Sequence, residues 1–468
     1  MDNIKVSVIT VSLNVADYIR ECIDSILAQT LKDIEVICVD GGSTDGTEEI
    51  LKEYAENDPR VRFVHAEKKS VGYQMNLGIR LARGKYIGYV ETDDSIMPEM
   101  YEDLYKIAEY HQTDFVKGDY YTRTGDLAHR QLTHEVWGYD DSWYDRVIDI
   151  SQEMDIFEMY HFEIWTGLYR TEWLRKNRIK ANETMGASYQ DTGFYFQTFA
   201  YAKRAYFTHK PYYMYRIDNP NASISSSGKV NCICTEFELL EKRLREDPER
   251  FEHFKYVMTY RAFYCYRWNL DRINKKYKEG FLEKFSEDFR RFYDEGMLDF
   301  KLFYNDEPAL LQIYKIILNP LSYYRPLTRT SYDQGENPQF VFPYHLFPPR
   351  SKVLIYGAGS VGRSFYVQAK EHKYVTISGI VDKNAKNIEA YDIPVRPIED
   401  IPMMDNDYIL IAIEDERIAN SVRQNLRDMG IADKAIAWDG EAYQRRNFYK
   451  KRYFKGLKFL HGVKAPAF

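Results

Sequence analysis

The feature that most restricts the fold of this chain is a regular alternation of strand and helix patterns over its N-terminal part. Four short runs rich in β-branched and aromatic residues have the composition of buried strands: 5–13 (KVSVITVSL), 33–40 (DIEVICVD), 60–65 and 85–90 (KYIGYV). Helical spacing of apolar residues follows the first three of them, over 16–30, after Ser43 and over 75–82, with Ser43 as the expected N-cap. Strands that alternate with helices predict a parallel sheet covered on both faces.

Length and composition set the number of domains and exclude some classes of protein. The chain has 468 residues, and at roughly 150 residues per domain this predicts about three domains. A net charge of −7 argues against a nucleic-acid partner. The five cysteines form no CxxC pair, and Cys22 and Cys38 fall in buried segments, which is typical of a cytoplasmic protein. No apolar run is long enough to span a membrane, so any membrane contact should be peripheral, at the inner face.

Changes in residue pattern and composition along the chain predict four regions. Residues 1–230 carry the first α/β pattern, and residues 231–345 read as long amphipathic helices followed by a Pro-rich linker. A second α/β pattern occupies 346–442, and a basic, aromatic tail occupies 443–468. Such a tail is either a solvated terminus or a segment that contacts anionic lipid headgroups.

Polar residues gather where three of the predicted strands end. Parallel sheets bind ligands beyond the carboxyl ends of their strands, and these ends read Ser12-Leu13-Asn14, Asp40-Gly41-Gly42 and Glu91-Thr92-Asp93-Asp94. Asp40 can accept hydrogen bonds from a base imide or a ribose hydroxyl, or it can cap the next helix together with Ser43.

The cluster at the fourth strand end indicates a cation. Three carboxylates within four residues, Glu91, Asp93 and Asp94, repel one another unless a positive charge lies between them. A divalent cation prefers such oxygen ligands and would neutralise a diphosphate leaving group. The alternative is a solvated acidic turn.

These motifs carry a family resemblance. The run SVITVSLNVADYIRECIDSILAQTLKDIEVICVDGGSTDGT, followed by MNLGIRLARGKYIGYVETDD, resembles family 2 glycosyltransferases of the GT-A fold. The resemblance covers residues 4–120 and implies an inverting transferase of bacterial surface-polysaccharide synthesis. The fold class expected for the chain is therefore α/β, with a GT-A nucleotide-sugar-binding domain, a helical middle region and a small Rossmann-like domain at the C-terminus.

The resemblance assigns roles to residues of the first domain. It implies that Asp40 holds the nucleotide base and that Asp93, with Glu91, ligates Mn²⁺ or Mg²⁺. Two departures stand out, since Leu13 replaces a common Tyr and Glu91 replaces the first Asp of the usual Asp-x-Asp. The full set of donor-binding residues expected from the resemblance is Val11, Ser12, Asn14, Asp40, Gly41, Asn76, Gly78, Thr92, Asp93 and Arg216.

Two later segments complete the expected active site. Residues 186–194 look like the family's (Glu/Gln)-Asp-x-x-Phe element, which makes Asp191 the catalytic base that takes the proton of the acceptor hydroxyl. Asp191 could also serve as N-cap of a helix that starts at Thr192. Arg216 is either a clamp for the diphosphate or a brace for Asp191 or another acid.

The second α/β region contains a dinucleotide-type fingerprint. A strand leads into Gly357-x-Gly359-x-x-Gly362 at the start of a helix, and Asp382 ends the next strand. The segment resembles Rossmann-like domains appended to sugar-processing proteins, so its expected ligand is a nucleotide or dinucleotide. No Tyr-x-x-x-Lys pair or similar constellation follows, which favours a binding or structural module over a redox enzyme.

The leading hypothesis is an inverting, metal-dependent transfer of a hexose or N-acetylhexosamine from a nucleoside-diphosphate sugar, UDP-linked, to a glycan or lipid-linked acceptor. One alternative is an NAD(P)-dependent sugar-nucleotide oxidoreductase or epimerase centred on Gly357. A second alternative is a non-catalytic sugar-nucleotide-binding scaffold. The joint presence of Asp40, Asp93 and Asp191 argues against the scaffold, because a binding module needs no base.

Overall fold

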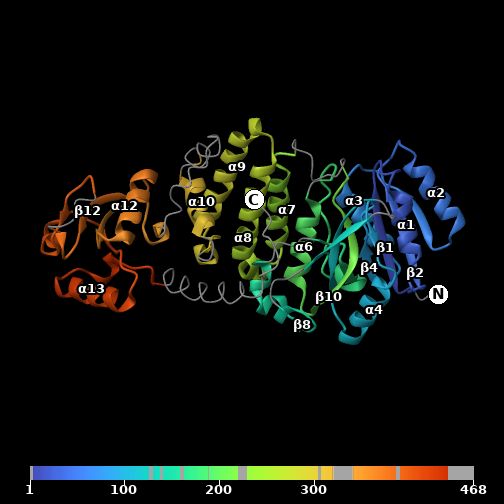
Figure 1. Ribbon diagram of the computed structural model, residues 1–468, viewed down its shortest axis with the longest axis horizontal. Coiled ribbons are helices and arrows are strands. Elements are labelled where there is room, and N and C mark those ends of the chain that lie inside the picture. Colours follow the sequence, from blue (N-terminus) through green and yellow to red (C-terminus); the bar gives the residue numbers. More distant parts are fainter. Residues whose placement is uncertain are drawn as a thin grey trace. The chain divides into compact units, whose positions relative to one another are not determined.

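The computed structural model divides into two compact units, Met1–Asn274 and Lys275–Phe468, and each is described by itself (Figure 1). The structure describes residues 4–440 apart from 126–129, 137–140, 159–162, 188, 220–228, 304–306, 319, 321–339, 341 and 386–390. The predicted basic tail over 443–468, the start of the Pro-rich stretch at Asn337 and Ser188 lie outside the described residues.

The first unit is built on one mixed sheet with the strand order β3-β2-β1-β4-β9-β6-β10-β5, to which β7 adds on β6 and β8 on β10. Strands β3, β2, β1 and β4 are parallel, and β9 runs antiparallel between β4 and β6. The strands are β1 (Val6–Ser12), β2 (Ile34–Asp40), β3 (Val61–His65), β4 (Tyr86–Tyr89), β5 (Ser95–Ile96), β6 (Phe115–Thr124), β7 (Gln131–Glu135), β8 (Val147–Ile148), β9 (Gly167–Arg170) and β10 (Ala205–Arg216).

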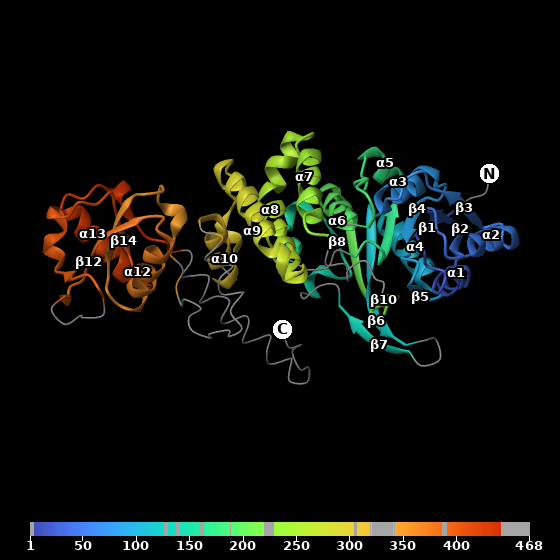
Figure 2. The ribbon, with the colours of Figure 1, turned by 90° about the horizontal axis from the view of Figure 1, so that it is seen from above.

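Helices cover this sheet, and two of them belong to the region that the sequence separates as helical. The helices are α1 (Ile19–Leu27), α2 (Thr47–Asn57), α3 (Val71–Leu81), α4 (Met100–His111), α5 (Thr171–Lys176), α6 (Gln190–Tyr201), α7 (Cys232–Leu244) and α8 (Pro248–Arg272), with 3₁₀ turns at Asp141–Trp143, Ile150–Gln152 and Met154–Glu158. Helices α7 and α8 pack on α6 (Figures 1 and 2). The first compact unit, Met1–Asn274, includes these two helices.

Helix α6 is buried on almost every side. Residues 192–200 are all buried, and Phe199 stacks on Phe115 of β6 with ring centroids 5.3 Å apart. A helix that is apolar all round lies inside a protein, and α6 lies between the sheet and the helices α7 and α8. Its first turn, which contains Asp191, is consequently held from both sides.

The predicted alternation over the first 90 residues is confirmed, with two corrections at helix starts. Ser43 is not an N-cap: α2 begins at Thr47 and its N-cap is Gly46, with φ of 101°. The Ser43 hydroxyl instead donates to Asp40, which keeps residues 41–46 in a turn. Helix α3 begins at Val71 rather than at residue 75, because the Ser70 side chain accepts a hydrogen bond from the backbone N–H of Tyr73 and caps it.

The second unit contains a five-stranded parallel sheet in the order β13-β12-β11-β14-β15. Numbered along the chain, this is the order 3-2-1-4-5 of a doubly wound nucleotide-binding fold. The strands are β11 (Lys352–Tyr356), β12 (Thr376–Val381), β13 (Val395–Arg396), β14 (Tyr408–Ile411) and β15 (Ile436–Ala437). The helices are α9 (Lys275–Asp294), α10 (Glu307–Leu318), α12 (Ser360–His372) and α13 (Glu416–Asp428), with 3₁₀ turns at Phe300–Phe303, Tyr344–Leu346, Ile398–Met403 and Asp433–Ala435.

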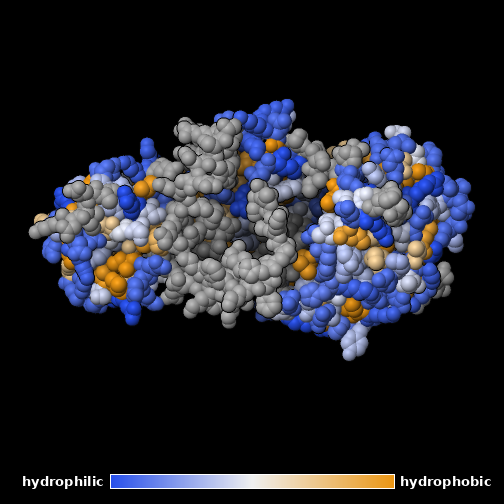
Figure 3. Space-filling view, in the orientation of Figure 1, coloured by the Kyte–Doolittle hydropathy of each residue, from blue (hydrophilic) through white to orange (hydrophobic). Residues whose placement is uncertain are grey.

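The described surface is largely hydrophilic, with small, separate apolar patches on the face seen in Figure 3. Among the described residues, none of the helices has the length and hydropathy that crossing a membrane would require.

The lack of space beside Gly78 shows that α3 packs closely on β1. A Cβ at this position would lie 2.6 Å from the Ile9 side chain, and Ile9 is itself buried. Glycine to alanine in a helix normally stabilises by about 0.5–1 kcal/mol. We expect Gly78→Ala to lower the free energy of unfolding by about 1–3 kcal/mol, because overpacking outweighs the gain in helix propensity. Urea denaturation measures this, and Arg80→Ala on the exposed face of α3 is the matched control. An increase in stability for Gly78→Ala would contradict the close packing.

Candidate functional site

The predicted site residues of three strand ends meet at one edge of the first sheet. In that sheet β1 lies between β2 and β4, so the strand order reverses beside β1. Ligands of parallel α/β sheets bind at such a reversal, beyond the carboxyl ends of the strands. Ser12 and Asp40 are register partners there, and the Thr92 hydroxyl donates to the carbonyl of Val11 across the β1–β4 boundary.

Asp40 is the centre of the turn that follows β2. It is fully buried, and its Oδ1 accepts hydrogen bonds from the hydroxyls of Ser12 (2.9 Å) and Ser43 (2.6 Å). Its Oδ2 accepts from the backbone N–H groups of Gly42 and Ser43, both at 2.8 Å. Asn14, at φ 56°, ties the end of β1 to the same turn, since its Oδ1 accepts from the backbone N–H of Thr44. The turn is therefore rigidly built around one carboxylate.

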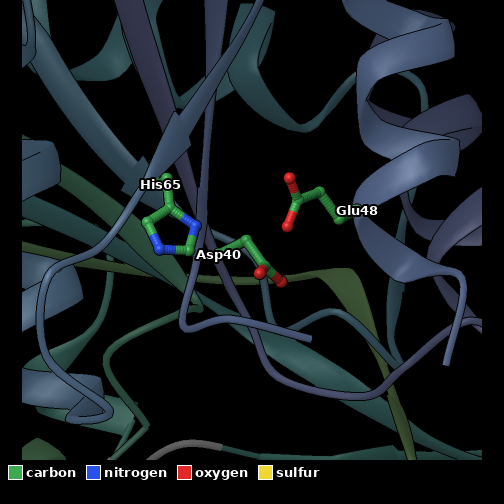
Figure 4. Close-up of side chains that lie close together, drawn as sticks. All are labelled: Asp40, Glu48 and His65. Atoms are coloured by element: carbon green, nitrogen blue, oxygen red, sulfur yellow. The ribbon is translucent and has the colours of Figure 1, made fainter. Parts of the chain in front are cut away.

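Two further polar side chains converge on Asp40, as Figure 4 shows. Ligand atoms of Asp40, Glu48 and His65 all lie within 4.8 Å of one another. The Asp40 oxygens already accept four hydrogen bonds, three from the turn and one from Ser12 of β1, so this group is a poor candidate for a cation compared with the acidic loop after β4.

The acidic loop after β4 places three carboxylates together. Oxygens of Glu91, Asp93 and Asp94 lie within 4.8 Å of one another. Asp94 is buried, and burial and then the Asp93 charge raise its pKa well above the ordinary value. Strand β10 donates two hydrogen bonds to Asp94: one from the Tyr213 hydroxyl at 2.8 Å and one from the Arg216 backbone N–H at 2.7 Å. Such a concentration of negative charge is stable only beside a positive charge.

The oxygens of this loop fit a divalent cation. One Asp93 oxygen accepts from the Asn219 amide at 2.8 Å, and both Asp94 oxygens are engaged by β10. Carboxylate oxygen remains on Asp93 and on Glu91, whose residue surface is exposed. Hard cations such as Mg²⁺ and Mn²⁺ prefer oxygen ligands. Asp93 and Glu91, the predicted pair, are the residues that would hold the ion.

Arg216 lies at the centre of an ion-pair network. Its guanidinium donates to Glu21 of α1 at 2.8 Å, to Asp218 at 3.3 Å and to the backbone carbonyl of Asp93 at 3.0 Å. Buried Arg123 of β6 pairs with the other Glu21 oxygen at 2.7 Å. Of the two roles expected for Arg216, this geometry matches the brace for an acidic loop, and the diphosphate clamp stays a prediction.

Asp191 lies in the first turn of α6, and main-chain pairing fixes this turn to the start of α3. The backbone N–H of Val71 donates to the Gly186 carbonyl, and the backbone N–H of Gly186 donates to the Lys69 carbonyl. The Gln190 amide then donates to the same Gly186 carbonyl at 3.0 Å. The N-cap is Tyr189, and the Asp191 carboxylate accepts from the backbone N–H of Thr192.

The charge of Asp191 influences the pKa of Glu91 in the acidic loop. The pKa of Glu91 is raised by loss of solvent around its carboxyl group and then by the charges of Asp94, Asp93 and Asp191. Asp191 has an exposed residue surface, and crowding by protein raises the pKa of its own carboxyl group. The structure thus brings the predicted base and a predicted metal ligand close enough to influence each other.

Asn76 and Gly78 make their contacts elsewhere. The Asn76 amide exchanges hydrogen bonds with the backbone of Ala181, at 2.9 and 3.0 Å, and also donates to Glu183. Gly78 lies against Ile9. These contacts hold α3 against β1 and against the segment around Ala181, and the donor-binding role of both residues stays a prediction.

Sequence reasoning missed Glu236 of α7, which lies beside Gly193, two residues after Asp191. The residue is buried, and a Cβ on Gly193 would lie 2.0 Å from its Oε1. Burial raises the pKa of Glu236 to about 8, and the Asp191 charge adds to the shift. Nothing in the sequence marks it, because α7 reads as an ordinary amphipathic helix.

The fingerprint of the second unit forms the expected strand–turn–helix. Gly357 has φ of 107°, and a Cβ on Gly362 would lie 1.9 Å from the Gly357 carbonyl, so α12 packs closely on β11. Gly359 is the N-cap of α12 and has open space beside it. The Asp382 carboxylate accepts from the backbone N–H of Ala358 at 2.8 Å, which ties it to the glycine turn.

Comparison with known proteins identifies the class to which this fold and site belong. Residues 7–208 match the model of glycosyl transferase family 2. The glycosyltransferase YibD of Escherichia coli is 30% identical over 267 residues, which cover 56% of this chain and 75% of YibD. The chain belongs to glycosyl transferase family 2. The glycosyltransferase EpsJ of Bacillus subtilis is 32% identical over 222 residues, 46% of this chain, and the match spans 62% of EpsJ.

Solved structures support the fold class. The structure of TarS residues 1–349 from S. aureus in complex with UDP-GlcNAc superimposes with a TM-score of 0.53 at 20% identity, covering 71% of this chain and 92% of that one. The same TarS fragment with UDP gives the same TM-score. The predicted α/β fold of the GT-A type, with a second parallel sheet in the C-terminal unit, is confirmed.

Glu236 makes the stability of the first unit depend on pH. Its carboxyl pKa is about 8 in the folded state, against an ordinary value of 4.5. The folded state therefore keeps a proton that the unfolded chain releases, and stability falls as pH rises from about 4.5 toward 8. We expect Glu236→Gln to raise the free energy of unfolding at pH 8.5 by on the order of 2–4 kcal/mol and to leave it unchanged at pH 4.

Urea denaturation at the two pH values measures this difference. Glu238→Gln on the exposed face of α7 is the matched control, and it should shift stability equally little at both. A Glu236→Gln variant with no gain at high pH would show that the buried group is not protonated.

Proposed function

We propose that this chain is an inverting, metal-dependent hexosyltransferase that moves a hexose or N-acetylhexosamine from a UDP-linked donor to a glycan or lipid-linked acceptor in cell-surface polysaccharide synthesis. The observation that carries the proposal is the arrangement at the β1–β4 strand ends. There the Asp40 turn and the Glu91–Asp94 loop follow neighbouring strand ends, and the charge of Asp191 helps to raise the pKa of Glu91.

Donor binding is assigned to the strand ends of β1, β2 and β4. The Asp40 turn offers a rigid set of polar groups for the base and ribose, and the acidic loop lies at the neighbouring strand. Family membership supports the use of a nucleoside-diphosphate sugar. Uridine is the favoured nucleoside, because the fold matches the TarS structure with UDP-GlcNAc.

Asp93 and Glu91 would hold Mn²⁺ or Mg²⁺, with Asp94 and Arg216 fixing the loop that carries them. When bound, the ion supplies positive charge for the diphosphate that leaves the sugar. Arg216, paired with Glu21, Asp218 and the Asp93 carbonyl, keeps the two ligand residues in place.

Asp191 accepts the proton of the acceptor hydroxyl in this proposal. As the acceptor oxygen forms its bond to the anomeric carbon, the bond from that carbon to the diphosphate breaks on the opposite face, and configuration inverts. A base works best with a pKa near the working pH, and the raised pKa of the Asp191 carboxyl group moves it in that direction. The anchoring of α6 to α3 through Gly186 holds the base in position.

The second unit has a supporting role in this proposal. Its strand order and glycine turn suit a nucleotide or dinucleotide, with Gly357, Gly359, Gly362 and Asp382 as the contact residues. We assign it binding or regulation rather than a redox reaction. The location proposed for the enzyme is the cytoplasm at the inner membrane face, where a lipid-linked acceptor is available.

The first test is calorimetric titration of UDP, GDP, CDP and NAD⁺ with and without Mn²⁺. Manganese-dependent binding of UDP supports the proposal. Tight NAD⁺ binding with no response to any diphosphate would move the functional centre to the Gly357 turn.

Asp191→Asn separates chemistry from donor binding. The variant keeps the shape of the side chain but cannot accept the acceptor's proton, so we expect transfer to fall by about 10²–10⁴-fold. UDP affinity should stay within about twofold of the wild-type value. A loss of UDP affinity in place of a loss of rate would remove Asp191 from the role of base.

Asp93→Ala tests the cation site. Removal of one of two ligand residues should abolish the gain in UDP affinity that Mn²⁺ confers, while metal-free UDP binding changes little. Titration of UDP with and without Mn²⁺ measures this, and Glu56→Ala, which removes an exposed acid of α2 outside the cluster, is the control. An unchanged Mn²⁺ response in Asp93→Ala would refute the ligand assignment.

A further inference from the structure

Tyr213 of β10 places one hydroxyl group against both ends of the acidic loop. Its oxygen accepts a hydrogen bond from the backbone N–H of Glu91 at 2.9 Å, and the hydroxyl donates to Oδ2 of Asp94 at 2.8 Å. The direction of the first bond is fixed, because a backbone N–H can only donate. The hydroxyl proton is therefore left for the Asp94 carboxylate, and a single group joins the first residue of the loop to the last.

Main-chain pairing determines that Tyr213 lies at this loop. Strand β5 begins at Ser95, directly after the loop, and pairs antiparallel with β10, where Ile96 is the register partner of Tyr213. The loop itself is a tight turn, since the backbone N–H of Asp94 donates to the Glu91 carbonyl at 3.1 Å. The Tyr213 hydroxyl thus adds a second closure to a turn that the main chain closes once.

The ring of Tyr213 is held in one orientation. The residue is fully buried, and its ring stacks on Trp165 with centroids 4.0 Å apart and planes at 26°. Trp165 also stacks on Tyr215, two residues along β10 and on the same face, at 5.3 Å and 14°. A hydroxyl on a ring packed in this way cannot swing away from the loop, so its two hydrogen bonds constrain the loop rather than follow it.

The two residues that the hydroxyl joins lie on either side of Asp93 in the chain. Oxygens of Glu91, Asp93 and Asp94 lie within 4.8 Å of one another. Like charges at this spacing repel, and a loop that was free to open would relieve the repulsion by moving its carboxylates apart. Closure by Tyr213 keeps the ligand oxygens together before an ion binds.

We propose that Tyr213 is a positioning residue of the cation site, which fixes Glu91 and Asp93 for the ion by joining the two ends of their loop. The inference rests on the proposed function, because it takes the ion to bind at these two residues. Tyr213 itself is not a ligand in this arrangement, since its oxygen is engaged by the Glu91 N–H and its proton by Asp94.

Tyr213→Phe tests the inference, because it removes the hydroxyl and keeps the ring that stacks on Trp165. Free Mn²⁺ is measured by electron paramagnetic resonance while the ion is titrated into the full chain with saturating UDP. We expect the variant to bind Mn²⁺ about 10–100-fold more weakly than wild type, as is typical when a partner that orients metal ligands is lost. UDP affinity without metal, measured calorimetrically, should change little.

Tyr86→Phe is the matched control. Tyr86 is also fully buried, its hydroxyl donates to the Glu109 carboxylate at 2.8 Å, and it lies at the opposite end of β4 from the acidic loop. Both variants lose a hydrogen bond to a carboxylate, so both should lower the melting temperature of the ligand-free protein. Only Tyr213→Phe should also lose part of the rise in melting temperature that Mn²⁺ adds in the presence of UDP, which a purely structural role would not affect.

Three results would overturn the inference, and they can be told apart. Equal Mn²⁺ affinity in wild type and Tyr213→Phe shows that the loop is fixed without the hydroxyl. An equal loss of Mn²⁺ affinity in Tyr86→Phe assigns the effect to general stability instead of to Tyr213. A wild-type chain that binds UDP with no response to Mn²⁺ refutes the proposed cation site itself, and the inference fails with it.

Discussion

Mutual repulsion of the carboxylates after β4 is the constraint on which the rest of the site depends. Strand β10 stabilises the acidic loop, because its Tyr213 hydroxyl and Arg216 backbone N–H donate hydrogen bonds to Asp94. Arg216 in turn is held by Glu21 of α1, which also pairs with Arg123. The loop is thereby fixed to three separate elements, and the oxygens left for a cation are those of Asp93 and Glu91.

The strands and the acidic loop could be predicted because their signals are local in the sequence. Strands buried on both faces read as short apolar runs, and the predicted strand over 33–40 matches β2 within one residue. Glu91, Asp93 and Asp94 lie within four residues of the chain, so their proximity in space can be predicted without knowledge of the tertiary structure. Helix starts were less predictable, since Ser43 satisfies its hydroxyl on Asp40 and leaves the capping of α2 to Gly46.

The partners of these residues could not be predicted, because they come from distant parts of the chain. Glu21 and Arg216 are 195 residues apart, and no pattern joins a first-helix acid to the last strand of the sheet. Glu236 reaches Gly193 in the first turn of α6 only because α7 packs on α6. The family resemblance names Asp40 and Asp191, but it does not reveal that the Asp40 oxygens are engaged by the turn.

Two acidic side chains of the first unit are buried at a cost to stability, Asp94 after β4 and Glu236 on α7. Asp94 is buried beside like charges, and burial raises the pKa of Glu236 to about 8. Burial of such groups lowers the stability of the folded state unless partners compensate their charge. The sheet and the buried helix α6 supply the stability that offsets these groups.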